Sequence, residues 1–95
     1  MRTLLGTAAL LATSAAFAQS VPIEKDAIIT KVDGMDLTKV IEPAVGMIRA
    51  HGWRCDSISA MRPFLMSRGF TVVCNGFSYE YEFEDRGGNW VVTLG

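Results

Sequence analysis

The sequence of 95 residues contains a single histidine, His51, which is where a search for catalytic chemistry begins. Nucleophilic catalysis needs a Ser, Cys or Thr beside a base, and no recognised motif places such a nucleophile next to His51. Asp56 and Ser57 follow along the chain, but this pair has no base. We expect His51 instead to end a helix, where a donor suits the helix dipole. We therefore predict no catalytic residues and a protein that is not an enzyme.

Glu80, Glu82 and Glu84 are spaced so that they could be considered as ligands of a cation. In an extended strand they lie on the same side, with neighbours about 7 Å apart. That spacing is too wide for adjacent carboxylates to share one ion comfortably. The three residues therefore predict a solvated outer face, and we expect neither a metal site nor a cofactor.

Cys55 and Cys74 are the only cysteines. They are too far apart in the sequence for a C-x-x-C redox motif, and together with one histidine they do not supply a zinc site. In an oxidising compartment the remaining interpretation is a structural disulfide, and a loop of this size contributes about 3 kcal/mol to stability. We predict a Cys55–Cys74 disulfide that joins neighbouring strands.

Residues 62–69 contain the best candidates for binding a partner. The segment has an apolar tip bracketed by two arginines, and residue types of these kinds are enriched at protein interfaces. The candidate residues are Arg62, Phe64, Leu65, Met66 and Arg68. Two interpretations stay open: a contact surface for another protein, or a lid in which Phe64 and Leu65 fold back onto the core. An anionic membrane surface is a further possible contact.

The C-terminal half predicts an antiparallel sheet. Residues 77–84 alternate aromatic with polar side chains, which is the period of a half-buried strand. Asn75 and Gly76 predict a two-residue turn that pairs Cys74 with Phe77 and Phe70 with Tyr81. The predicted disulfide adds a strand at residues 53–60, with Ser57 near Val72. Residues 85–89 form a second turn, before a last strand at residues 90–94.

This register places nine side chains on one face of a four-stranded antiparallel meander. They are Trp53, Phe70, Val72, Phe77, Tyr79, Tyr81, Phe83, Trp90 and Val92. The face needs a cover, and residues 37–48 have the apolar periodicity of an amphipathic helix. Asp36 is a candidate N-cap and Gly52 a candidate C′ residue. Pro43 implies either a kink or a second helix that begins with Pro43 at its first position.

The first 18 residues read as a cleaved signal peptide. A short positive segment at Arg2 precedes an apolar run, and Ala16-Phe17-Ala18 is an A-x-A cleavage signature before Gln19. We predict export to the periplasm or the medium, with no transmembrane segment after cleavage. Residues 19–35 form an N-terminal extension of uncertain structure, strand or helical turn at residues 27–32. Residues 36–95 form a single α+β domain.

Composition narrows the classes of function. Nine Lys and Arg face ten Asp and Glu, so the net charge is −1 and the basic surface of a nucleic-acid-binding protein is absent. The length also excludes a Rossmann domain with a substrate domain, or a TIM barrel. The class that remains is a single small domain with a modest hydrophobic core, stabilised by the predicted disulfide.

The order of the predicted elements resembles PepSY-type domains. The similarity is in the helical residues 37–52, the hairpin at residues 70–84 and the turn at residues 85–90 before a last strand. Residues 55–58 together with 85–90 also resemble small secreted bacterial proteins of unassigned function. The PepSY resemblance implies a protein-binding or protease-regulating module, and no functional residues are carried over from it.

Two classes of function stay open at this point. The first is a small exported, non-catalytic module that binds or inhibits an envelope or secreted protein. The second is a small periplasmic hydrolase or metal-dependent enzyme, and a purely structural role in the envelope is a further alternative. A deep polar cleft would favour the enzyme, whereas an exposed apolar loop on a convex domain would favour the binding module. The oligomeric state is left open.

Overall fold

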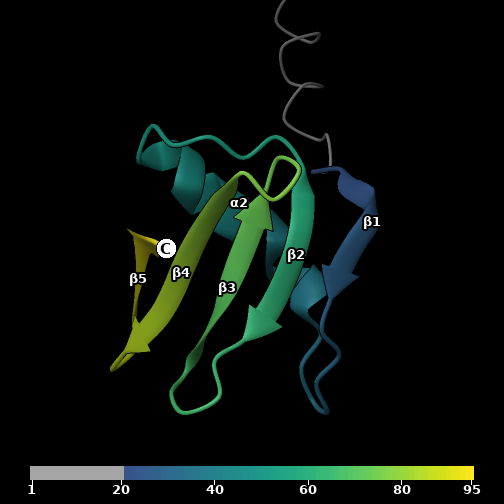
Figure 1. Ribbon diagram of the computed structural model, residues 1–95. Coiled ribbons are helices and arrows are strands. Elements are labelled where there is room, and N and C mark those ends of the chain that lie inside the picture. The colour runs from purple at the N-terminus through teal and green to yellow at the C-terminus, as the bar shows by residue number, and fades with distance from the viewer. Residues whose placement is uncertain (1–20) are drawn as a thin grey trace, which may run out of the picture.

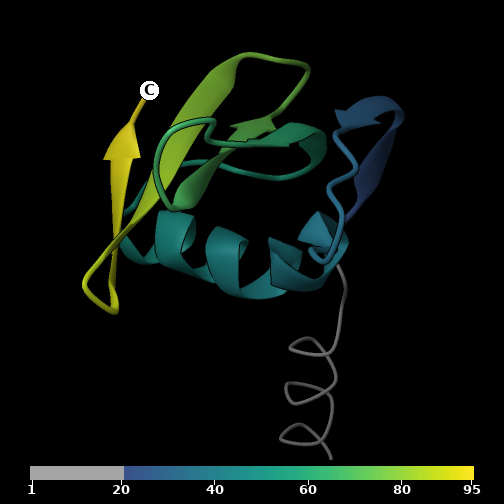
Figure 2. The ribbon, with the colours of Figure 1, turned by 90° about the horizontal axis from the view of Figure 1, so that it is seen from below.

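The computed structural model describes residues 21–95. The predicted signal peptide and its cleavage site lie outside the described residues. In chain order the elements are strand β1 (Ile23–Ile29), the 3-10 helix η1 (Leu37–Val40), helix α2 (Ile41–Ala50) and four strands, β2 (Ile58–Pro63), β3 (Gly69–Cys74), β4 (Tyr79–Arg86) and β5 (Asn89–Leu94). The fold is α+β, with the helices packed across one face of a sheet (Figures 1 and 2).

The sheet has five strands in the order β1-β2-β3-β4-β5. Strands β2 to β5 form the antiparallel meander that the sequence predicts. The prediction of four strands is wrong, because β1 adds a fifth strand that pairs parallel to β2. Parallel neighbours need a crossover connection, and η1 with α2 supplies it between β1 and β2. The stretch of uncertain structure at residues 19–35 therefore contains an edge strand.

The turn between β3 and β4 is longer than predicted. Cys74 pairs with Tyr79 and Phe70 with Phe83, so the register is two residues away from that of a two-residue turn. Asn75, Gly76 and Phe77 all have positive φ, at 55°, 62° and 65°. The Asn75 side-chain oxygen accepts hydrogen bonds from the main chain of residues 56 and 57. These bonds fix the turn against the segment before β2. A shift of two residues preserves the two faces of the sheet.

The strand predicted at residues 53–60 begins later, at Ile58. Met61, and not Ser57, lies opposite Val72, and a register shift separates Ile58 from Ala60. Cys55 therefore precedes the strand, although the predicted disulfide to Cys74 is confirmed, with the two Cα atoms 5.3 Å apart. At the other end of the sheet β4 continues to residue 86, and the predicted turn at 85–89 shrinks to the two glycines at 87 and 88.

The helical segment follows the predicted pattern but is divided into two parts. Asp36 caps the 3-10 helix, because its carboxylate accepts the Thr38 N–H at 3.0 Å. Pro43 is the third residue of α2, within the first turn, where main-chain N–H groups have no partner in the helix. A second helix therefore does follow a short first one, but it begins at Ile41 and not with Pro43 at its first position. Gly52 ends the helix as predicted: its φ is +79°, and its N–H donates to the Arg49 carbonyl.

The core lies between the helices and the predicted face of the sheet. Of the nine side chains assigned to that face, Phe70, Val72, Tyr81, Phe83 and Val92 are buried. Trp53 is partly buried against them, although it precedes the sheet. Phe77, Tyr79 and Trp90 are 53%, 41% and 45% exposed. The prediction that the helical segment covers all nine side chains is therefore wrong. The helical cover consists of Leu37, Ile41, Ala44, Val45 and Ile48.

Candidate functional site

The link between β2 and β3 has a closed base. The N–H of Phe64 donates to the Gly69 carbonyl at 2.9 Å, and the carbonyl of Arg68 accepts the Asp85 N–H at 3.1 Å. Strand β4 therefore supports the loop as well as the two strands that it connects. A loop held in this way loses little conformational entropy when it binds a partner.

Phe64 and its two neighbours in this loop have different surroundings. Phe64 is half-buried and packs on the loop base, where a Cβ added to Gly69 would lie 2.6 Å from its ring. Leu65 and Met66 are 94% and 95% exposed. Phe64 therefore packs against the base of its own loop, whereas Leu65 and Met66 project into solvent. We call Leu65 and Met66 the apolar tip.

The two arginines do not flank the apolar tip together. Arg68 lies in the loop and pairs with Asp85 at 3.2 Å, and the Asp85 side chain is only 6% exposed. Arg62 lies in β2, because this strand extends further than predicted. It pairs with Glu80 at 3.3 Å, between half-exposed side chains. Only Arg68 remains beside the tip as a charged candidate residue.

A carboxylate clasp that the sequence did not indicate lies at the opposite end of β2. One oxygen of Glu24 accepts three hydrogen bonds: from Ser57 Oγ at 2.6 Å, Ser59 Oγ at 2.8 Å and the Gly76 N–H at 2.9 Å. Ser59 Oγ also accepts the Phe77 N–H at 2.9 Å. These bonds join β1, the start of β2 and the turn before β4. We call Glu24, Ser57 and Ser59 the Glu24 clasp.

The hydrogen bonds of the Glu24 clasp hold separate segments of the chain together. The Ser57 hydroxyl, the Gly76 N–H and the Ser59 hydroxyl, in that order, hold the pKa of Glu24 below its usual range. A carboxylate with a lowered pKa is a poor general base for a serine nucleophile. No local pattern could have revealed the clasp, because its partners are 33 to 52 residues from Glu24 in the sequence.

His51 sits at the end of α2, as its position in the sequence predicted. Its ring stacks on Trp53, with centroids 4.6 Å apart, and Trp53 stacks on Tyr81 at 5.7 Å. The Tyr81 hydroxyl donates to the Arg54 carbonyl at 2.6 Å, and burial raises the Tyr81 pKa. Asp56 pairs with Arg54 at 3.4 Å and accepts a hydrogen bond from Asn75. These side chains pack against one another and hold the main chain in place.

The three glutamates on β4 do not converge on one point. Glu80 pairs with Arg62, and Glu84 pairs with Arg86 at 2.8 Å, while Glu82 is exposed. Within residues 21–95 no group of three or more His, Cys, Asp or Glu side chains is arranged to hold a metal ion. The outer face of β4 therefore carries charge pairs in contact with solvent.

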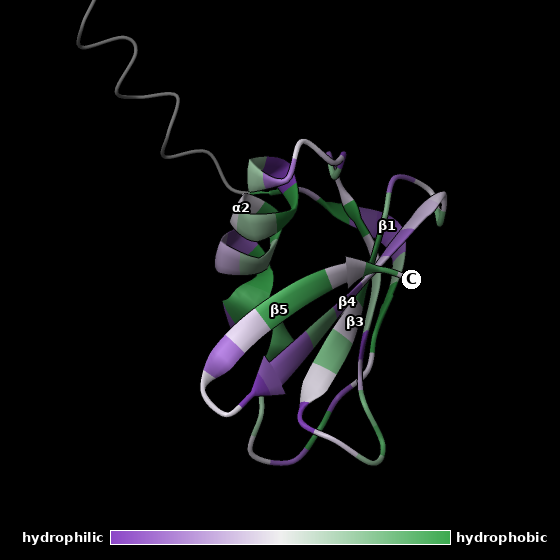
Figure 3. Cartoon of the chain, turned by 90° about the vertical axis from the view of Figure 1, so that its left-hand side faces the viewer, coloured by the Kyte–Doolittle hydropathy of each residue, from purple (hydrophilic) through white to green (hydrophobic). Residues whose placement is uncertain are grey.

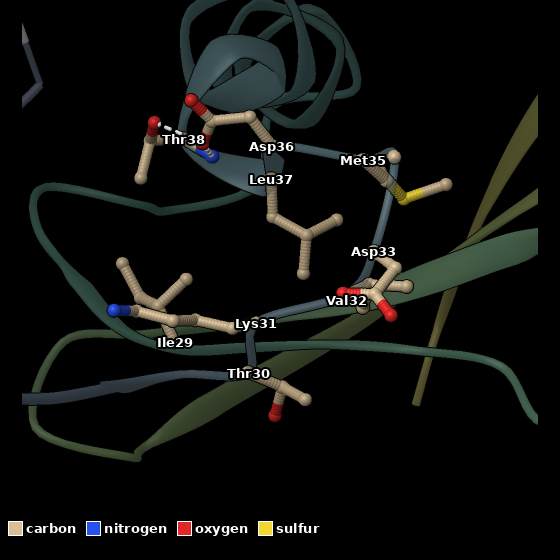
Figure 4. A pocket seen from close by; sticks show the side chains of 10 residues that line it. Ile29, Thr30, Lys31, Val32, Asp33, Met35, Asp36, Leu37 and Thr38 are labelled. Atoms are coloured by element: carbon tan, nitrogen blue, oxygen red, sulfur yellow. Dashed lines mark hydrogen bonds between the residues drawn. The ribbon is translucent and has the colours of Figure 1, made fainter.

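One hollow, of about 530 Å³, lies along residues 29–38 (Figure 4). An isolated bridge between Val32 and Met35 shapes this connection. Figure 4 shows the Leu37 side chain directed into the hollow, and the charged ends of Lys31 and Asp33 directed away from each other. The Asp36 carboxylate is held by Thr38, whose hydroxyl and main-chain N–H lower the Asp36 pKa. The polar groups of this hollow do not converge on a common ligand position.

A second, smaller hollow is almost entirely apolar and lies beside β5. Its volume is about 200 Å³, and α2 forms one wall while the sheet forms the other. The lining residues are Val40, Pro43, Ala44, Met47, Phe70, Phe83 and Trp90. We call this hollow the β5 groove.

Comparison with known proteins places the chain in no family: no family model, no curated protein and no solved structure matches it. The resemblance to PepSY-type domains therefore gains no support and stays a prediction. Within residues 21–95 no helix is long and apolar enough to cross a membrane.

Proposed function

We propose that this protein is an exported, non-catalytic module that binds another protein through the apolar tip. The observation that carries the proposal is the near-complete exposure of two adjacent large apolar side chains, Leu65 and Met66, on a loop with a closed base. Full burial of a Leu or Met side chain in a partner is worth about 1.5–3 kcal/mol. The main-chain bonds at the loop base reduce the entropy lost when the tip is buried.

The surroundings of the tip favour a partner that presents an apolar pocket with carboxylates near its rim. The Arg68 side chain is 84% exposed, so its guanidinium has free donors besides its contact with Asp85. Arginine is well suited to a second carboxylate because its donors form a planar fork. The PepSY resemblance makes a protease the first partner to test.

The compartment part of the proposal rests on two features. The Cys55–Cys74 disulfide belongs to an oxidising environment, and the first 18 residues have the pattern of a signal peptide. Both support a periplasmic or secreted protein. The non-catalytic part is supported by the Glu24 clasp, whose carboxylate is a weak base, and by the polar groups around the larger hollow, which point apart.

Site-specific photo-crosslinking in exporting cells tests the proposal. A photoreactive residue at Ser67, next to the tip, should give one protein adduct, identified by mass spectrometry. The double change Leu65→Ser and Met66→Ser should abolish that adduct and leave the unfolding temperature within about 2 °C, because both side chains are exposed. The same photoreactive residue at Ile28, on the far edge of the sheet, is the control position.

The outcomes separate the remaining alternatives. An adduct that forms equally with the serine variant, or no protein adduct at all, would refute protein binding through the tip. Adducts with lipid alone would assign the tip to a membrane surface and also overturn the proposal. A large fall in unfolding temperature would show that the tip serves the core.

A further inference from the structure

The sheet has two edge strands, and they differ in their protection against a further strand. Natural edge strands are commonly protected by charges, prolines or bulges. β1 carries the exposed charges of Lys25 and Asp26, and its register with β2 is irregular. β5, with the sequence NWVVTL, has no charge and no proline, and its ladder with β4 is regular. Figure 3 shows β5 nearest the viewer, with no element of residues 21–95 on the outer side of this strand.

The β4–β5 hairpin determines which main-chain groups of β5 are free. Arg86 pairs with Asn89 across a two-residue turn, and the Gly95 N–H donates to the Glu80 carbonyl at 2.9 Å. Hydrogen-bonded pairs alternate along an antiparallel ladder, so every second residue of β5 bonds to β4. The N–H and C=O groups that point away from the sheet belong to Trp90, Val92 and Leu94.

We propose that two copies of this chain associate by antiparallel pairing of their β5 strands about a twofold axis at Val92. This register places Trp90 of each copy opposite Leu94 of the other, on the helix side of the sheet. Both side chains are exposed in the single chain, by 45% and 65%. On the outer side Val91 lies opposite Thr93, and no charged residue of one β5 meets a charge of the other.

The β5 groove gives the pairing a second point of contact. Trp90 forms one of its walls and packs on Phe70, with ring centroids 5.6 Å apart. Because Leu94 of the second copy lies opposite Trp90, it is the side chain that pairing brings to the mouth of the groove. The twofold axis repeats this contact, so both grooves are covered at once. The same segment therefore supplies both the apolar side chain and the site that receives it.

Sedimentation of the oxidised protein, measured over a range of concentrations, tests this association. The wild type should sediment as a dimer. Leu94→Lys should raise the dimer dissociation constant by about 100-fold or more, since each dimer would bury two uncompensated ammonium groups. Ile28→Lys is the matched control: it introduces the same charge on the opposite edge strand, at a side chain of similar exposure, 63%. This control should remain a dimer.

Charge complementation tests the proposed register. Trp90→Glu and Leu94→Lys should each be monomeric alone, and their mixture should form a heterodimer with one Glu–Lys pair and one native Trp–Leu pair. If Trp90→Glu does not fold, the comparison of Leu94→Lys with Ile28→Lys decides. A wild type that stays monomeric up to about 1 mM overturns the proposal. So does a Leu94→Lys variant that dimerises normally, or an Ile28→Lys variant that does not.

The β5 strand and the apolar tip are separate surfaces. The serine variant at Leu65 and Met66 should still dimerise, because neither side chain belongs to β5 or to its groove. If this variant no longer captures a partner but still forms the dimer, the two surfaces act independently.

Discussion

At the scale of single residues, Glu24 shows how one side chain can secure a strand that packing secures poorly. β1 is exposed at several positions, and only one face of its far end reaches the core, through Ile29. The clasp compensates by collecting three donors from two other segments onto one carboxylate oxygen. Hydrogen bonds to an ionised carboxylate are among the stronger ones in proteins.

The lowered pKa of Glu24 predicts a specific dependence of stability on pH. The folded-state pKa lies below the usual value near 4.5, so folding favours the ionised form. The stabilisation is therefore fully present above about pH 4.5 and is lost as pH falls through the lower, folded-state pKa. Glu24→Gln should unfold at a lower temperature than the wild type at pH 7, and the difference should shrink toward pH 3.

Thermal unfolding of both proteins between pH 7 and pH 3 checks this expectation. Glu82→Gln is the control, since Glu82 is an exposed carboxylate on the outer face. A difference between Glu24→Gln and wild type that stays constant over this range would show that the ionised clasp does not stabilise the fold.

Substitutions at neighbouring residues of β4 should change the free energy of unfolding by very different amounts, because the side chains point to opposite faces of the sheet. Phe83 is 1% exposed and stacks on Phe70, with ring centroids 5.0 Å apart, whereas Glu82 is exposed. Phe83→Ala should cost about 3–5 kcal/mol of unfolding free energy through lost packing and the cavity that remains. Glu82→Ala should cost no more than about 0.5 kcal/mol. Urea titration measures both, and equal losses would mean that the two faces are assigned wrongly.

At the scale of elements, the disulfide fixes the approach to β2 and not β2 itself. Cys55 precedes the strand, and both sulfur-bearing residues are fully buried beside the end of β3. The bond therefore holds the connection from α2 against the sheet. The Glu24 clasp lies at the same end of the strands, so a disulfide and a set of hydrogen bonds both stabilise this end.

Removal of the disulfide should affect stability strongly. The sequence separation of 19 between the two cysteines corresponds to about 3 kcal/mol. A change of 1 kcal/mol moves the midpoint of a domain of this size by roughly 4–8 °C, so Cys55→Ala with Cys74→Ala should lower it by about 12–24 °C. Calorimetry with and without reductant measures the effect. Reductant should lower the wild-type midpoint similarly and leave the double variant unchanged.

The sequence predicted those parts of the fold that local patterns encode. Alternation along β4 assigned the faces correctly, and a pair of cysteines after a predicted signal peptide implied the bond. The register between β3 and β4 was missed because Asn75 uses its side chain to bind the segment before β2. β1 was left open, with a strand or a helical turn at residues 27–32 as alternatives, because it combines charged residues with a parallel partner about 35 residues away, a pairing that no local pattern records.

The candidate loop was predicted in part. Its apolar composition located the tip, and Leu65 and Met66 are almost fully exposed there. The position of Arg62 was not predictable, because a register shift follows Ile58 and the strand ends later than predicted, which places this residue on the outer face. Phe64 packs on the loop base because Gly69, which lacks a side chain, leaves room for its ring.

At the scale of the whole molecule, the strands are held together at one end by the disulfide and the Glu24 clasp, and carry the candidate loop at the other end. In Figure 1 the turn after β3 lies at the upper end of the sheet, and the connection between β2 and β3 lies at the lower end. A partner bound at the loop would therefore meet the end of the sheet farthest from the disulfide. The proposed pairing edge, β5, runs along the side and leaves the loop accessible in both copies.

The placement of the disulfide has a consequence for proteolysis. Exposed loop tips are preferred sites of cleavage, and the loop at residues 64–68 lies inside the segment that Cys55 and Cys74 close. A cut between Leu65 and Met66 would therefore leave both fragments joined covalently, with β2 and β3 still paired. The nicked molecule would separate into two pieces only after reduction. A protease that attacked the loop would still face an intact fold.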